Sequence, residues 1–274
     1  FRSESRHLGL KMPEELPHIK EELKLLSQAF SETVSLDEIM TIAEEAGGLS
    51  QPGIEGVKKG TENKDMPVIA VARDEAFCFY YEDNLQLLEE YGARLSYFSP
   101  LHDRTLPQEC DGILLGGGYP ELYAEELGEN KTMLSQIREA ISDGMPIVAE
   151  CGGFMYLHEF IQDKENKKQN MTGVIPAGCH DTGKLVRFGY IEIKEKKASF
   201  LPEGQVIRGH EFHYFDSEKN GEDCIASKPV SGKTYPCILA GETYWMGFPH
   251  LYYPSNPAFA RNFVEKAAKR KGVT

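Results

Sequence analysis

The sequence has no CxxC pair, no structural zinc pattern, no signal peptide and no long apolar segment. Without a signal peptide, a reduced, cytoplasmic setting is expected, with free thiols and no disulfide framework. No metal site is expected in this chain either, because the usual ligand spacings are missing. Six cysteines are spread widely along the 274 residues: Cys78, Cys110, Cys151, Cys179, Cys224 and Cys237.

The chain also has few basic residues compared with its acidic ones. Lysine and arginine together number 30, aspartate and glutamate 43, and the formal net charge is -13. Nucleic acids and anionic membrane surfaces would repel such a chain, so neither is expected as a partner. The length suffices to bury a full core and to form one large or two modest domains.

A convincing ATP-binding loop is missing as well. The run Ser231-Gly-Lys-Thr234 matches the end of a phosphate-binding loop, but Ser227 occupies the position where that motif needs glycine, and no helix is expected to follow. No cofactor is therefore expected in this chain. Because the sequence begins at Phe1 and not at methionine, it is expected to be part of a longer product.

Residues 1–65 form a region of their own. Apolar residues from Ile19 to Phe30 recur at helical spacing, and Ser35-Leu-Asp-Glu38 resembles a capping box that opens a second helix through about Glu45. The stretch Gly47–Asp65 is rich in Gly, Lys and Glu and is interpreted as a mobile linker. We therefore expect a domain boundary near residue 65, with a second domain over residues 66–274.

From Pro67 the pattern changes to short apolar strands separated by helices. This order predicts an α/β fold with a doubly wound, mostly parallel sheet, whose active site lies beyond the carboxyl ends of the strands. The later part of the chain has β-hairpin character before a final helix at Asn256–Lys269. The expected strands are Val68–Ala72, Leu95–Phe98, Gly112–Leu115, Ile147–Ala149, Val186–Lys194, Gln205–Tyr214, Asp223–Ser227, Tyr235–Leu239 and Thr243–Met246. The expected helices between them are Glu82–Tyr91, Met133–Ser142 and one that begins after Cys151.

Cys151 lies where a buried-strand pattern meets two glycines and an amphipathic run, which is the pattern of a nucleophile elbow. The amide groups of the following helix would favour the thiolate, so a lowered thiol pKa is expected. The alternative is a structural cysteine packed in the core. The glycines Gly116–Gly118 follow another strand and are either a plain tight turn or a source of main-chain N–H groups for an oxyanion hole.

A cysteine nucleophile needs an imidazole as its base, and the chain has eight histidines. His158 is expected on the helix after Cys151, and His102 and His180 in loops. His210 and His213 should point to opposite faces of one strand, which argues against a chelating pair and leaves structural or substrate-side roles. His250 follows the last strand and is the best candidate for the base.

Several motifs together resemble the cobyrinic acid a,c-diamide synthase family. They occur in the family's order over residues 67–265, and Arg6-His-Leu-Gly-Leu10 resembles the end of that family's amino-terminal ATP-dependent domain. The motifs are Val71-Ala-Arg-Asp-Glu-Ala-Phe-Cys-Phe-Tyr-Tyr-Glu-Asp-Asn-Leu85, Gly116-Gly-Gly-Tyr-Pro-Glu-Leu122, Ala149-Glu-Cys-Gly-Gly-Phe-Met-Tyr-Leu157, Arg208-Gly-His-Glu-Phe-His-Tyr214 and Pro254-Ser-Asn-Pro-Ala-Phe-Ala260.

The resemblance implies a class I glutamine amidotransferase fold in which Cys151 attacks the side-chain amide of glutamine and His250 activates it. Gly117 or Gly118, with the N–H of Gly152, would form the oxyanion hole. Tyr252 stands where many related enzymes have a triad glutamate, which implies a dyad without the acid. Four residues of the Arg208–Tyr214 motif are expected at the substrate or domain interface: Arg208, His210, Glu211 and His213.

The resemblance further implies that ammonia passes to an amino-terminal synthetase domain that uses ATP and magnesium to amidate the a and c carboxylates of a corrinoid. That domain's phosphate-binding loop is not in these residues. Three alternatives remain: the same role toward nickel-sirohydrochlorin or another tetrapyrrole acid, a noncatalytic docking module with a relic thiol, and an amidase or cysteine peptidase on the same fold.

Overall fold

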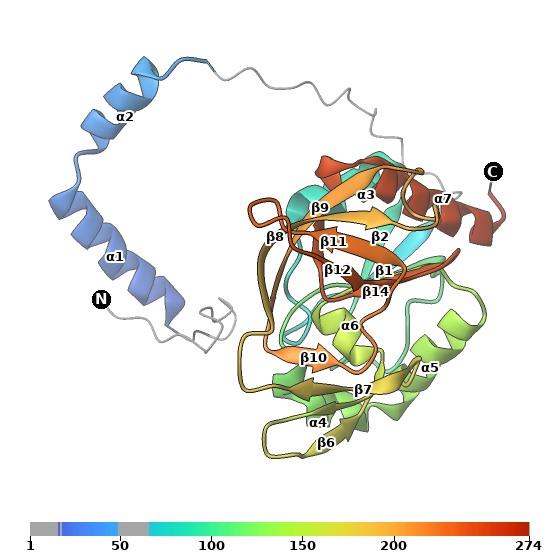
Figure 1. Ribbon diagram of the computed structural model, residues 1–274. Coiled ribbons are helices and arrows are strands. Elements are labelled where there is room, and N and C mark those ends of the chain that lie inside the picture. The colour runs from blue at the N-terminus through green and yellow to red at the C-terminus, as the bar shows by residue number, and fades with distance from the viewer. Residues whose placement is uncertain (1–15, 17, 49–65, 274) are drawn as a thin grey trace. The chain divides into compact units, whose positions relative to one another are not determined.

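The structure is a computed structural model that describes residues 16, 18–48 and 66–273 (Figure 1). The chain divides into two compact units, Phe1–Gly56 and Val57–Thr274, and each is described by itself. The junction between the units lies outside the described residues, as does most of the predicted linker Gly47–Asp65.

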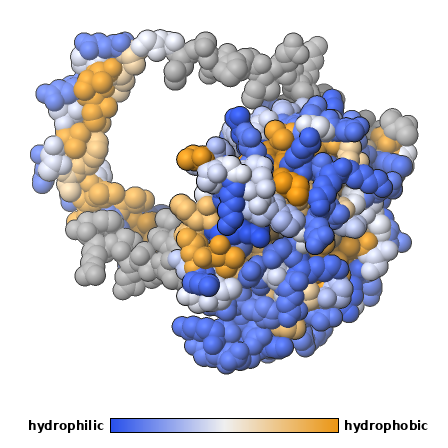
Figure 2. All heavy atoms as spheres, in the orientation of Figure 1, coloured by the Kyte–Doolittle hydropathy of each residue, from blue (hydrophilic) through white to orange (hydrophobic). Residues whose placement is uncertain are grey.

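The first unit contains the two helices that the sequence predicts, α1 (Ile19–Thr33) and α2 (Leu36–Glu45). The Ser35 side chain accepts a hydrogen bond of 3.3 Å from the N–H of Glu38, which satisfies one of the free donors at the start of α2. Neither helix buries a side chain, and Figure 2 shows apolar atoms running along both of them.

The second unit is organised around a six-stranded sheet in the order β13-β14-β4-β3-β1-β2. All pairings are parallel except that of the edge strand β13, so the predicted doubly wound, mostly parallel sheet is confirmed. The strands are β1 (Val68–Ala72), β2 (Arg94–Phe98), β3 (Gly112–Leu115), β4 (Ile147–Glu150), β13 (Leu239–Ala240) and β14 (Tyr244–Gly247).

Alternate residues of the central strands enter two separate hydrophobic cores, because successive side chains of a strand point to opposite faces. One core contains Ala70, Ile113 and Ala149 and is completed by α4 (Ala124–Glu129), α5 (Lys131–Ser142) and the segment after Cys151. The other contains Val71 and Leu114 and is completed by α3 (Glu82–Glu90) and α7 (Ala258–Lys271). The sheet is therefore covered on both faces.

Two smaller sheets account for the β-hairpin character of the later sequence. One has the order β12-β11-β8-β9-β15 and packs its apolar residues with α3 and α7, and the other has the order β10-β7-β5-β6. The first contains β8 (Arg187–Glu195), β9 (Val206–His213), β11 (Cys224–Ser227), β12 (Thr234–Cys237) and β15 (His250–Tyr252). The second contains β5 (His158–Gln162), β6 (Lys168–Asn170), β7 (Ile175–Asp181) and β10 (Phe215–Ser217).

This second sheet corrects two of the sequence predictions. The helix after Cys151, α6 (Gly152–Tyr156), is only five residues long, and His158 begins β5 where a helix was expected. His180 lies in β7, whereas a loop was expected. Neither β5 nor β7 has a clear apolar alternation in the sequence. They are strands because they pair with each other, and because β5 also pairs with β6 and β7 with β10.

Other features agree with the sequence. Phe259, Phe263 and Ala267 of α7 are buried as one helical face, and within residues 66–273 no disulfide joins the six cysteines. The Ser231–Thr234 run leads into β12 and not into a helix, so it does not form a phosphate-binding loop. Among the described residues, no helix is both long and apolar enough to cross a membrane.

Candidate active site

The candidate site lies at the carboxyl ends of three neighbouring strands. Leu115 of β3 is paired with Ala149 of β4, and Glu150 of β4 is paired with Gly247 of β14. The residues that follow these ends are therefore neighbours: the Gly116–Gly118 loop, Cys151, and the short connection from β14 to His250. Parallel strands bring these separated stretches to one edge of the sheet, as the sequence predicts.

Cys151 sits in a sharp turn between β4 and α6. Its backbone has φ 46° and ψ -103°, a conformation that costs energy for a residue with a side chain and is typical of a nucleophile elbow. The Cys151 N–H donates to the carbonyl of Gly247 at 2.9 Å, which ties the elbow to β14. A Cβ on Gly152 would lie 2.9 Å from Cδ of Pro120, so only glycine fits after the cysteine.

The glycine loop lies against Gly152, the residue after Cys151, and against His250. The nitrogen of Gly118 is 3.1 Å from the point where a Cβ of Gly152 would stand, so the two glycines border the same small space. A Cβ on Gly117 would lie 2.3 Å from Cε1 of His250. Bare main chain is thus required where the loop, the elbow and the histidine meet, as an oxyanion hole requires.

His250 is the first residue of β15 and is buried. Its ring is stacked on His210 with 4.8 Å between centroids, and Phe79 contacts it edge-on at 4.8 Å. Its Nδ1 atom is buried and has no hydrogen-bond partner among the described residues. Packing against rings and the glycine loop, and not a hydrogen bond to an acid, therefore holds the imidazole.

The expectation of a lowered thiol pKa is wrong, because burial dominates at Cys151. Burial raises the pKa of Cys151, and nearby Glu121 raises it further, while the Gly152 N–H lowers it by a smaller amount. Burial likewise lowers the pKa of His250 to about 3. The five-residue α6 stabilises a thiolate too weakly to offset the loss of water, so the two pKa shifts favour a neutral thiol and a neutral imidazole.

The four residues assigned to the substrate or domain interface divide between two faces of β9. Arg208 is exposed and pairs with Glu192 at 3.2 Å, and the half-buried His210 accepts or donates a 3.2 Å hydrogen bond with the Tyr81 hydroxyl. Glu211 and His213 point inward. His210 and His213 therefore lie on opposite faces of the strand, as the sequence predicts from the alternation of side chains.

The inward pair belongs to a buried charged cluster. Glu211 is fully buried, its carboxylate lies 3.3 Å from Arg187, and it accepts a hydrogen bond from the Tyr235 hydroxyl. The His213 ring is stacked on Phe248 with 4.0 Å between centroids. Only Arg208 and His210 of the four are thus on the outward face of this strand.

Tyr252 does not approach the imidazole of His250. Its hydroxyl donates a 3.0 Å hydrogen bond to Asp83, and its ring contacts Tyr81. The position of the triad acid in related enzymes is therefore occupied by a side chain that turns away toward α3. Among the described residues, no group of three or more His, Cys, Asp or Glu side chains is arranged to hold a metal ion.

Three further residues support the site; the sequence gives no role to Tyr80 or Asn84 and marks Glu150 only as the neighbour of Cys151. The Tyr80 hydroxyl donates to the Ala72 carbonyl and accepts from the Gly116 N–H at 2.9 Å, so it fixes the start of the glycine loop. Asn84 and Glu150 are buried and contact the segment that carries His250. Two of them lie inside the quoted 71–85 motif, but nothing in a single sequence identifies their partners.

A mostly parallel sheet covered on both faces, with the Cys151 turn, the glycine loop and His250 at one edge, is the fold of class I glutamine amidotransferases. A solved structure described as a glutamine amidotransferase aligns with a TM-score of 0.51 and 14% identity, over 73% of this chain and 98% of that one. At that identity the match supports the fold.

The family model for the CobB/CobQ-like glutamine amidotransferase domain matches residues 68–234. The chain belongs to this family. It is 38% identical to a cobyrinate a,c-diamide synthase of Dehalococcoides mccartyi over 94% of this chain, and 41% identical to one of Clostridium tetani over 96%. It spans 57% and 59% of the length of these two relatives.

Proposed function

We propose that this chain is the glutamine-hydrolysing part of a cobyrinate a,c-diamide synthase. The observation that carries the proposal is the meeting of the Cys151 elbow, the Gly116–Gly118 loop and His250 at one edge of the sheet. Each of the three parts has a chemical role in acyl transfer from an amide.

In the proposed reaction, the sulfur of Cys151 attacks the side-chain amide carbon of glutamine. Because the pKa shifts favour a neutral thiol and a neutral imidazole, His250 takes the thiol proton as the S–C bond forms and gives it to the leaving nitrogen. Ammonia leaves and a glutamyl thioester remains, which water hydrolyses to glutamate and free thiol. The main-chain N–H groups of Gly118 and Gly152 would stabilise the oxyanion.

The ammonia would serve a synthetase domain that lies outside this chain. The relatives are named cobyrinate a,c-diamide synthase and are longer than this chain, which supports a corrinoid acid as acceptor and a second domain as partner. ATP and magnesium would bind to that domain, because the Ser231–Thr234 run leads into a strand and offers no cradle for phosphates. The same chemistry would serve nickel-sirohydrochlorin as acceptor.

The first 65 residues are proposed to be the helical tail of that synthetase domain together with a linker. Large apolar side chains of α1 and α2 are exposed, among them Leu23, Phe30 and Ile42, which is 69% exposed. Such stripes normally pack against another element. Hydrogen exchange of α1 and α2 should slow when the synthetase domain of a relative is added; unchanged exchange would argue against this assignment.

The decisive experiment is glutamate release from glutamine by the unmodified chain, Cys151→Ala and His250→Ala. A control is Cys224→Ala, which removes another buried thiol from β11, away from the sheet edge. Loss of activity in Cys151→Ala, strong reduction in His250→Ala and full activity in the control are expected. The assay is repeated with the synthetase domain and its substrates, since some amidotransferases need an occupied synthetase site.

A noncatalytic docking module is the second candidate, and the raised pKa of the Cys151 thiol is the observation that favours it. A glutamine analogue carrying a diazoketone separates the two. An amidotransferase should be alkylated at Cys151 and protected by glutamine, whereas a docking module should not react faster there than at Cys224.

A further inference from the structure

The buried histidine of the proposed dyad lacks the acid that orients the imidazole in a catalytic triad. Its Nδ1 atom has no hydrogen-bond partner within the described part of the chain, and its ring contacts are the stacked His210, the edge of Phe79 and the main chain at Gly117. None of these contacts is a directed bond to the ring. Besides this packing, the position of the ring depends on the main chain of β15, which also pairs with β9.

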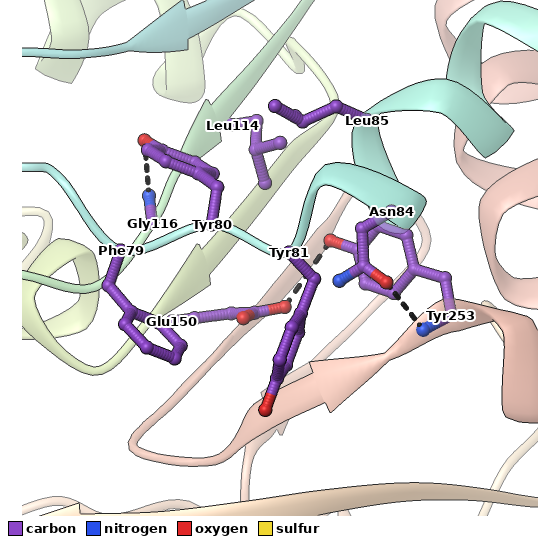
Figure 3. A pocket seen from close by; sticks show the side chains of 9 residues that line it. All are labelled: Phe79, Tyr80, Tyr81, Asn84, Leu85, Leu114, Gly116, Glu150 and Tyr253. Carbon is purple, nitrogen blue, oxygen red and sulfur yellow. Dashed lines mark hydrogen bonds between the residues drawn. The ribbon is translucent and has the colours of Figure 1, made fainter. Parts of the chain in front are cut away.

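That main chain is held by the side chain of Asn84, at the start of α3. Its Nδ2 donates to the Leu251 carbonyl at 2.8 Å, and its Oδ1 accepts from the Tyr253 N–H at 2.8 Å. One amide group thus spans two peptide units directly after His250. Figure 3 shows Asn84 pointing at the Tyr253 nitrogen from the first turn of the helix.

Glu150, the last residue of β4, holds the same segment from the central sheet. One carboxyl oxygen accepts from the Leu251 N–H at 3.3 Å and the other from the Tyr253 hydroxyl at 3.3 Å. Figure 3 shows the Glu150 side chain directed toward Tyr253. Because Glu150 immediately precedes Cys151, this carboxyl group joins the nucleophile's strand to the segment that bears the base.

Together Asn84 and Glu150 saturate the polar groups of Leu251 and Tyr253 that face them, and both side chains are buried, with 6% and 7% of their surface exposed. The adjoining cavity leaves about 10 Å³ for the centre of a water-sized molecule, which is room for at most one water.

We propose that Asn84 and Glu150 are positioning residues that fix His250 against Cys151 by clamping the main chain of residues 251–253, in place of a triad acid. This inference rests on the proposed glutaminase function. Neither residue contacts the reacting atoms; both act through the position of the imidazole. A displacement of the base by about 1 Å is enough to slow an enzyme on the order of 100-fold.

The test compares Asn84→Leu with Asn130→Leu. Asn130 is a matched control, because it is 4% exposed and its amide, like that of Asn84, makes two 2.8 Å hydrogen bonds to the main chain; here Nδ2 donates both, to the carbonyls of Pro100 and Asp103. Asn84→Leu should lower kcat for glutamine on the order of 100-fold with KM changed less than about threefold. Asn130→Leu should lose a similar amount of stability and keep kcat.

The Glu150 variants provide a second comparison if Asn84→Leu does not fold. Glu150→Gln keeps a carbonyl oxygen that can accept from Leu251 or Tyr253 and should retain kcat within about threefold, while Glu150→Leu should lose on the order of 100-fold. Equal kcat values for Glu150→Gln and Glu150→Leu, or for Asn84→Leu and Asn130→Leu after correction for folded protein, would overturn the clamp.

A readout without turnover separates this inference from the proposed function. With ¹⁵N-labelled histidine, Asn84→Leu should shift or broaden the ring signals of His250, and Asn130→Leu should leave them unchanged. If the chain has no Cys151-dependent activity but this difference is seen, the glutaminase proposal fails and the clamp stands. An unchanged His250 signal in Asn84→Leu would overturn the clamp whatever the activity.

Discussion

Glu150 is predicted to make the stability of this protein fall as the pH rises. Burial raises the pKa of its carboxyl group from 4.5 to about 8, and the hydrogen bonds from Leu251 and Tyr253 offset only part of that increase. The folded state therefore holds a proton that the unfolded state has already released. Stability from this proton is fully present below the unfolded pKa of 4.5 and is lost as the pH approaches 8.

The size of the effect follows from the difference of about 3.5 pKa units, at about 1.36 kcal/mol for each unit. Between pH 4.5 and pH 8 the unfolding free energy should fall by up to about 5 kcal/mol because of this residue. Glu150→Gln cannot ionise, so the stability of the variant relative to the unmodified protein should rise by a similar amount over this range and level off above it.

Urea unfolding of both proteins at pH 5, 6.5 and 8 measures the difference. Glu159→Gln, which removes an exposed carboxyl group from β5, is the control for the loss of one acid. A difference between Glu150→Gln and the unmodified protein that stays flat or shrinks as the pH rises would refute the reasoning. It would mean that Glu150 is ionised in the folded protein and that water or a cation reaches it.

Three further predictions concern other residues of the unit. Gly117→Ala should lower glutaminase kcat at least about tenfold, because its Cβ would stand 2.3 Å from Cε1 of His250 and would displace the ring. The circular dichroism spectrum should stay the same. An unchanged kcat would contradict the contact between Gly117 and His250. Arg187→Met should cost about 3–5 kcal/mol in urea unfolding, since it leaves the fully buried Glu211 without its cation. Burial lowers the pKa of His158 to about 4, so the unfolding free energy should fall as the pH drops from 6.5 to 4. His158→Gln should make that fall smaller by about 3 kcal/mol. An equal fall in both proteins would exclude His158 as its cause.

Much of the fold could be predicted because its signals are local. The run Val68–Ala72 is β1 residue for residue, and the Ser35 cap opens α2 where the sequence indicates. Continuous apolar runs mark strands buried on both faces, and a helix cap depends on residues three apart. Such features need no knowledge of distant neighbours.

The elements that were missed depend on distant pairing. His158 starts a strand because β5 pairs with β7 and β6, and the sequence from 158 to 181 has no regular apolar alternation. The elbow pattern predicts a lowered thiol pKa, but it contains no information on how deeply the Cys151 thiol is buried, and burial raises that pKa. In both cases the surroundings, and not the local pattern, decided the outcome.

The sequence by itself determined the parts of the site that require a residue type: a cysteine at the end of a strand, glycines where side chains have no room, and a histidine after the last parallel strand. The tertiary structure alone decided how these parts work together. Asn84 reaches Tyr253 across 169 positions and Glu150 reaches Leu251 across 101. Contacts of that separation exist only once the sheet and helices are packed, because burial and hydrogen-bond geometry belong to the folded chain and not to any stretch of its sequence.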